Sequence, residues 1–212
     1  MPLARMQRGL EALYRVDTGV EIDDYVVGAE VRDLLVTGRR PREQLLALSE
    51  DGEDTALALF IDPAALANLE ARDPSRRHDD ENLGDFLLAI EGVSHFIYVV
   101  CCARTGRSVS QLELELQAEV DKYVACLLTG EPAAAVSAAL RRRLFGDAWY
   151  EPDLDRDERA RYRAANDNAN RYAAWLEATF VERRRIPEML AELRRFYRQG
   201  LAEKLSTIAR AA

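Results

Sequence analysis

The sequence predicts a helix-dominated α+β fold: a small antiparallel sheet covered by helices, followed by a long C-terminal helical hairpin. Two short β-type segments flank an acidic turn, and apolar residues recur at helical spacing through most of the remaining chain. Two amphipathic stretches joined by a short connection fill the end of the chain. We therefore divide the chain into an α+β part (1–154) and a hairpin (155–212) that packs on the same body.

The first half of the chain combines helices with a pair of strands. Leu3 to Tyr14 repeats apolar residues on one face of a helix. Residues 43–49 and 55–61 lie on either side of the acidic turn and predict two antiparallel strands. Asp62 and Pro63 then predict a helix start, because the aspartate accepts hydrogen bonds from free amides and proline has no amide to leave unpaired.

Residues 93–102 allow two interpretations. Eight of these ten residues are β-branched, aromatic or cysteine, and the segment follows Gly92. This composition favours a third strand, buried on both faces, at the centre of the core. The alternative is one continuous helix over about 82–103, which the length of the apolar region favours. We expect the strand.

The following segments are expected to be helical. Ser110, with a glutamate at position 113, indicates a capping box at the start of one helix. Pro132 predicts the start of another that ends near Phe145, and residues 146–154 predict a loop. Asp155 is expected to cap the first hairpin helix, and the second is expected to run unbroken from about 189 to 208.

Composition excludes several classes of protein. The 212 residues include 29 Lys+Arg, 37 Asp+Glu, two His and three Cys. No apolar run approaches the roughly 20 residues of a membrane span, and a net charge of −8 disfavours general nucleic-acid binding. The odd cysteine count indicates a reducing compartment, so we expect a cytoplasmic protein. Because no metal-binding or phosphate-binding motif is found, we expect no metal and no cofactor.

One group of residues could carry chemistry. If residues 82–103 were helical, Glu91 and His95 would share a face, and a neighbouring helix from 110 would bring Glu119 and Lys122 level with them. A histidine flanked by carboxylates can act as a general base or a metal ligand. A metal-dependent or acid/base hydrolase using Glu91, His95 and Glu119 is therefore one alternative. We expect instead that His95 is structural, with these carboxylates and those at 113 and 115 as its partners.

The hairpin supplies the predicted binding surface. Trp175, Phe196, Tyr197 and Arg198 are expected at or near a contact with another protein or a second copy, because aromatics beside arginines are typical of such contacts. The acidic residues of 1–100 would provide the complementary charge. We therefore predict a non-catalytic regulatory or adaptor protein that binds another protein.

A second alternative is a nucleic-acid-binding protein that uses the C-terminal arginines. It is disfavoured, because interleaved acidic residues leave a surplus of only +4 over residues 155–212.

Overall fold

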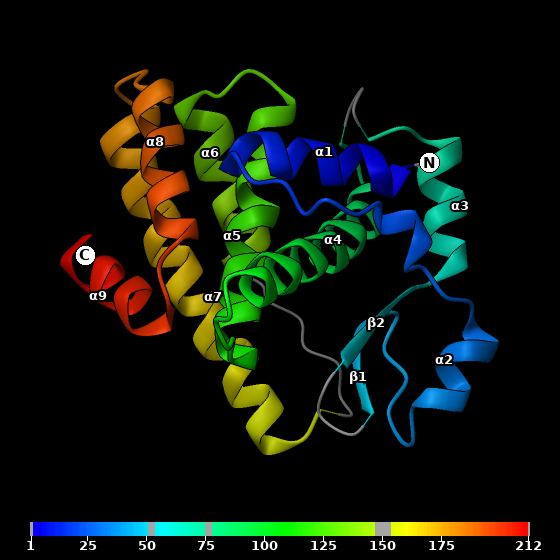
Figure 1. Ribbon diagram of the computed structural model, residues 1–212. Helices are drawn as coiled ribbons and strands as arrows, with labels where there is room; N and C mark the ends of the chain where they lie inside the picture. The colour runs from blue at the N-terminus through cyan, green and yellow to red at the C-terminus, as the bar shows by residue number, and fades with distance from the viewer. Residues whose placement is uncertain (1, 51–53, 75–77, 147–153, 212) are drawn as a thin grey trace.

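The computed structural model describes residues 2–50, 54–74, 78–146 and 154–211, and helices make up most of it (Figure 1). The central helix is α4, with α1 and α3 on one side and α5 beside it. In chain order, the elements are α1 (Pro2–Tyr14), the 3₁₀ turn η1 (Ile22–Asp24), α2 (Ala29–Leu35), β1 (Glu43–Glu50), β2 (Asp54–Ile61), α3 (Pro63–Ala71), α4 (Leu83–Arg104), α5 (Gln111–Thr129), α6 (Ala134–Arg141), the π-helical turn η2 (Arg142–Gly146), α7 (Arg156–Leu176), the π-helical turn η3 (Glu177–Val181), α8 (Ile186–Tyr197) and α9 (Leu201–Ala211).

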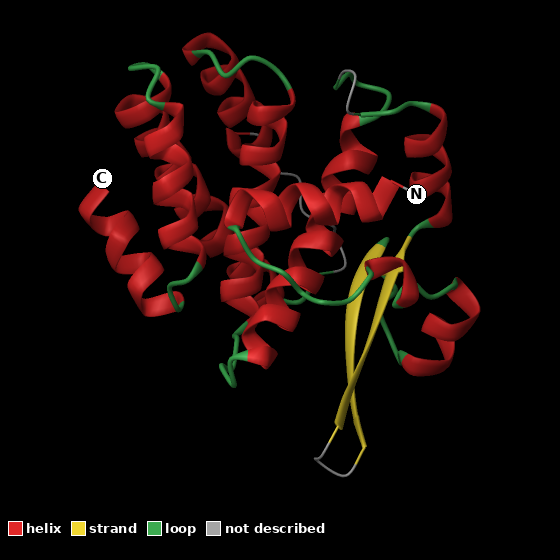
Figure 2. Cartoon of the chain, turned by 45° about the horizontal axis from the view of Figure 1, so that its top comes forward, coloured by secondary structure: helices red, strands yellow, loops and turns green. Residues whose placement is uncertain are grey.

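The predicted fold class, a helix-dominated α+β protein, is confirmed. β1 and β2 form a two-stranded antiparallel sheet in which Glu43 lies opposite Ile61, and the bounds of both strands agree with the prediction to within one residue. Figure 2 shows the strands extending away from the helices, with α2 beside them. The end of the sheet that carries Glu43 and Ile61 lies against α4.

The predicted third strand at 93–102 is wrong, because α4 is one continuous helix from Leu83 to Arg104. Most of α4 is buried, including Val93, Phe96 and Ile97. A helix that is buried around most of its circumference has no continuous polar face, so its sequence does not show the helical periodicity. By length and composition alone, α4 is also long and apolar enough to cross a membrane. However, 67% of its most apolar stretch is buried inside the protein, which is compatible with a soluble protein.

Most of the predicted helix starts are confirmed. The Asp62 side chain accepts a hydrogen bond from the Ala64 amide at 2.9 Å. The Asp155 side chain and its partner Glu158 form a reciprocal capping box. The Ser110 side chain accepts a hydrogen bond from the Glu113 amide, which is half of the expected capping box, and α6 begins two residues after Pro132. The predicted loop at 146–154 lies largely outside the described residues.

The predicted unbroken last helix is also wrong. α8 ends at Tyr197 and α9 begins at Leu201, and the Gly200 amide donates to the Glu203 side chain at 3.3 Å. The apolar spacing continues across this break, so the sequence pattern could not reveal it. The break lets α9 pack on α7, which itself lies along α5, and it places Lys204 inside the protein. A single buried core therefore contains residues from both parts of the chain.

Candidate functional site

Three elements bring a histidine and two carboxylates together inside the protein. Nδ1 of His95, on α4, lies 3.4 Å from Oε1 of Glu43 at the start of β1. Nε2 of the same ring lies 3.7 Å from Oε2 of Glu115 on α5. His95 is only 8% exposed, and its Nε2 has no hydrogen-bond partner among the described residues.

A lysine joins two further carboxylates to this group. Nζ of Lys122 lies 2.6 Å from Glu91 and 2.9 Å from Glu119. Solvent reaches the group from this side, because the Glu91 and Glu119 side chains are 18% and 19% exposed. Six residues form this central cluster: Glu43, Glu91, His95, Glu115, Glu119 and Lys122.

The structure brings all three candidate catalytic residues into this cluster. Glu91 and His95 share a face of α4, and α5 places Glu119 and Lys122 beside them, as the helical alternative for residues 82–103 required. The predicted partners of His95 were incomplete, because Glu43 on β1 was missed.

Glu113, which the sequence placed among the same carboxylates, lies elsewhere. It is buried. Its carboxylate accepts hydrogen bonds from Tyr98 and Arg107, each at 2.6 Å.

Gly92 allows β1 to approach α4 closely enough for Glu43 to reach His95. A Cβ atom at position 92 would lie 3.1 Å from Cγ of Glu43 and 3.1 Å from Cδ1 of Ile61. In the sequence, this glycine directly precedes the apolar run 93–102, a position that also fits the end of a helix. A glycine that instead lies inside a helix often marks a place where another segment comes close.

We expect alanine substitutions to distinguish Gly92 from Gly9, a glycine inside α1 whose Cβ would meet nothing within 4 Å. Gly9→Ala should raise the free energy of unfolding by about 0.5–1 kcal/mol, because alanine favours the helix. Gly92→Ala should gain less or become destabilising, because its methyl group presses on Glu43 and Ile61. Urea unfolding measures both, and equal gains would contradict the close approach.

Burial and neighbouring charges shift the pKa values of the cluster in different directions. Burial lowers the pKa of His95, but the nearby glutamates outweigh this effect and raise it to about 9. Burial raises the pKa of Glu115 to about 7, although His95 opposes the shift. Burial also raises the pKa of Glu91, but Lys122 and His95 outweigh it, and the net shift is downward. The carboxylates of the cluster therefore differ in how readily they hold a proton.

The same geometry offers a possible metal site. Glu43, Glu91 and His95 each present one ligand atom, and these atoms all lie within 4.8 Å of one another. Glu115 and Glu119 lie outside this set of three. Carboxylate oxygens and imidazole nitrogens are common ligands of divalent transition metals.

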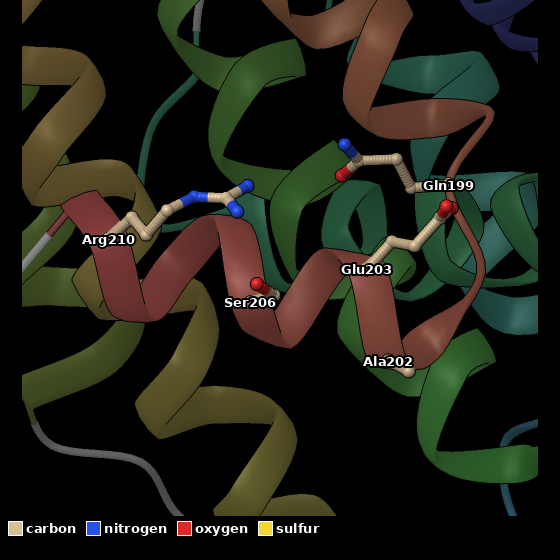
Figure 3. Close-up of a pocket in the computed structure, with 5 residues that line it drawn as sticks. All are labelled: Gln199, Ala202, Glu203, Ser206 and Arg210. Atoms are coloured by element: carbon tan, nitrogen blue, oxygen red, sulfur yellow. The ribbon is translucent and has the colours of Figure 1, made fainter.

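Two surface hollows lie away from the central cluster. The first, of about 350 Å³, follows α9 and is shown in Figure 3. The second, of about 280 Å³, lies between α1, α4 and α5 and is mostly apolar. No residue of the cluster lines either hollow. The lining residues of the first are Gln199, Ala202, Glu203, Ser206 and Arg210.

The four residues predicted at a protein contact pack against the chain itself. Phe196 and Tyr197 are buried, and the ring of Tyr197 stacks on Tyr14 with 4.0 Å between ring centroids. Trp175 is partly buried against the core. Arg198 donates to the backbone carbonyl of Tyr14 at 3.1 Å. Within one chain, these side chains hold the C-terminal helices on the rest of the protein.

Comparisons with known proteins give no further guide. None of the protein-family models, curated proteins or solved structures with which we compared the chain matches it.

Proposed function

We propose that this protein is a hydrolytic enzyme whose reactive centre is the central cluster. The observation that supports this most is the position of His95, enclosed between the carboxylates of Glu43 and Glu115 with one ring nitrogen unpaired. Hydrolysis needs a group that takes a proton from water and groups that stabilise developing charge. The cluster brings carboxylates, an imidazole and an amine together in one enclosed place. This is the hydrolase alternative of the sequence analysis, with Glu43 and Glu115 added.

Two residues of the cluster carry the reaction in this proposal. Glu119, on the solvent side, accepts one proton from a water molecule as the water oxygen bonds to the carbonyl or phosphoryl centre of the substrate. The bond to the leaving group then breaks, and the leaving group takes up the proton from Glu119, which restores the carboxylate. Lys122 remains protonated, because its two glutamate partners outweigh burial and raise its pKa well above the usual range. Its positive charge stabilises the negative charge that develops on the substrate.

Protein binding by a non-catalytic cytoplasmic regulator stays an alternative proposal. One observation favours it: no residue of α2 is buried, and Leu34 on this helix is 86% exposed. Exposed apolar side chains can mark interaction surfaces. The four hairpin residues do not add support, because they pack on the chain's own core or backbone.

Nucleic-acid binding gains no support from the arginines. Arg185 pairs with Glu188 at 3.1 Å, and Arg195 pairs with Glu192 at 2.6 Å. These pairs favour the mixed-charge surface that the sequence predicted over a site for a polyanion.

Hydrolysis of a panel of aryl esters and aryl phosphate esters tests the enzyme proposal. Glu119→Gln is expected to lower the rate by at least about 100-fold, because general acid–base groups contribute rates of this order. His95→Gln is also expected to lower the rate, because the cluster loses the imidazole that lies between Glu43 and Glu115. His78→Gln changes the chain's other histidine, outside the cluster, and should leave the rate unchanged. Equal rates in the wild type and both cluster variants, or no hydrolysis of any substrate, would contradict the proposal.

A further inference from the structure

We propose that the central cluster binds one divalent transition-metal ion through Glu43, Glu91 and Nδ1 of His95, with Glu115 orienting the imidazole from its other side. This inference builds on the proposed hydrolase, because it names the cofactor of the same centre. Metal binding can nevertheless be measured separately from hydrolysis.

The spacing of the three ligands suits one ion. Their ligand atoms all lie within 4.8 Å of one another, whereas two ligands on one ion at about 2.1 Å are at most about 4.2 Å apart. Movements of about half an ångström therefore bring them into coordination. Glu43 and Glu91 provide such movement, because glutamate side chains have several rotatable bonds. His95 is fixed on the enclosed helix α4.

The two nitrogens of His95 already face different partners. Nδ1 faces Glu43, a member of the ligand set, and Nε2 faces Glu115, which lies outside that set. A metal-bound histidine usually donates its other N–H to a carboxylate, which fixes the ring and makes it a better ligand. Glu115 occupies the position of that second carboxylate. The unpaired Nε2 would donate to it when an ion holds Nδ1.

The charge of the enclosed group also favours a cation. Among the described residues, its four carboxylates face two permanently charged side chains, Lys122 and Arg161, the latter with Nε 3.9 Å from Glu115. Buried carboxylates need cationic partners or a metal ion. A divalent ion at Glu43, Glu91 and His95 supplies two positive charges where the carboxylates converge.

The donor atoms favour a transition metal over magnesium or calcium. Mg²⁺ and Ca²⁺ prefer oxygen ligands alone, whereas an imidazole nitrogen with carboxylates suits Zn²⁺, Mn²⁺, Fe²⁺ or Co²⁺. The three cysteines are not among the ligands of this site. Burial raises the pKa of Cys101, Cys102 and Cys126, which keeps their thiols protonated and poor as metal ligands.

Calorimetric titration of the full chain with Zn²⁺, after removal of metals with EDTA, tests the proposal. We expect one equivalent of Zn²⁺ to bind and Mg²⁺ to bind at least 100-fold more weakly. His95→Gln and Glu43→Gln should each weaken Zn²⁺ binding by at least 100-fold, and Glu115→Gln by about 10–100-fold. His78→Gln is the matched histidine control and should bind as the wild type does.

Circular dichroism shows whether each variant is folded, and His95→Asn replaces His95→Gln if the latter is not. Visible absorption of the Co²⁺-loaded protein gives a second measurement, because its ligand-field bands should change when the His95 nitrogen is lost. Absence of Zn²⁺ binding to the folded wild type, or unchanged binding in both ligand variants, overturns the metal site. If the protein binds one Zn²⁺ ion but hydrolyses no substrate, the metal site is supported and the hydrolase proposal is overturned. If hydrolysis persists in EDTA and no Zn²⁺ binds, the hydrolase proposal is supported and the metal site is overturned.

Discussion

Replacing Ile97 with aspartate is expected to leave little or no folded protein. Ile97 is 1% exposed in the middle of α4, which packs against α1, α3, α5 and both strands. The substitution would bury a carboxylate among apolar side chains at a cost of several kcal/mol, a large share of the roughly 5–15 kcal/mol that stabilises a typical domain. Soluble yield and far-UV circular dichroism measure the loss.

The matched substitution at the same position is Ile97→Val. It removes one methylene group and should lower the free energy of unfolding by only about 0.5–1.5 kcal/mol. A soluble Ile97→Asp protein that melts cooperatively, near the temperature of the valine variant, would show that position 97 is not enclosed as described.

Residues 93–102 show what composition reveals and what it does not. Their β-branched and aromatic side chains predicted burial, and Val93, Phe96 and Ile97 are indeed buried. The same side chains did not reveal the backbone, because apolar periodicity requires a solvent-facing side and α4 has almost none. Secondary structure was predicted best where an exposed face or a capping residue marked it, as at Asp62 and Asp155.

The candidate site was predictable only in its local part. Glu91 and His95 are four residues apart, so helical geometry alone places them on one face. Glu43 is far away in the sequence, and it reaches His95 only because the sheet lies against α4 at Gly92. No spacing within one segment could reveal that contact. The one local signal of this close approach was Gly92, a glycine beside an apolar run. It did not decide the structure, because a glycine there also fits the end of a helix.

The position of Lys204 is a second feature that the sequence pattern did not indicate. It follows Glu203 in an amphipathic segment, and lysine is almost always at the surface. The break before α9 instead leaves it fully buried, where its amine donates to the side-chain oxygen of Gln117. The amine lies 4.4 Å and 5.0 Å from the ring centroids of Tyr98 and Phe196.

A polar network connects this lysine to α1 and α4. Gln117 donates to Asp121 at 2.8 Å, and the same carboxylate accepts hydrogen bonds from Ser94 and Tyr14. Burial raises the pKa of Asp121 to about 6 despite these hydrogen bonds. The network therefore contains two groups whose pKa values burial shifts, Asp121 and Lys204.

We expect Lys204 to make stability rise with pH from about 7 to 10.5. Burial lowers its pKa from 10.5 to about 7 in the folded protein, although Glu113 and Asp121 oppose the shift. Within this window the unfolded chain keeps a proton that the folded protein has lost, so raising the pH favours folding by up to about 1.4 kcal/mol per unit. Below about pH 7 both states are protonated, and the folded state carries the full cost of a buried ammonium group.

Lys204→Met tests this dependence, because methionine fills a similar volume without a charge. The difference in unfolding free energy, wild type minus variant, is expected to increase from pH 7 to pH 10 and to be flat between pH 5 and 6. Urea unfolding at each pH measures it. Glu203→Gln, on the exposed side of α9, is the control and should show a constant difference. A constant difference for Lys204→Met as well would mean that the folded protein holds the lysine charged at neutral pH, compensated by Gln117 and the two aromatic rings.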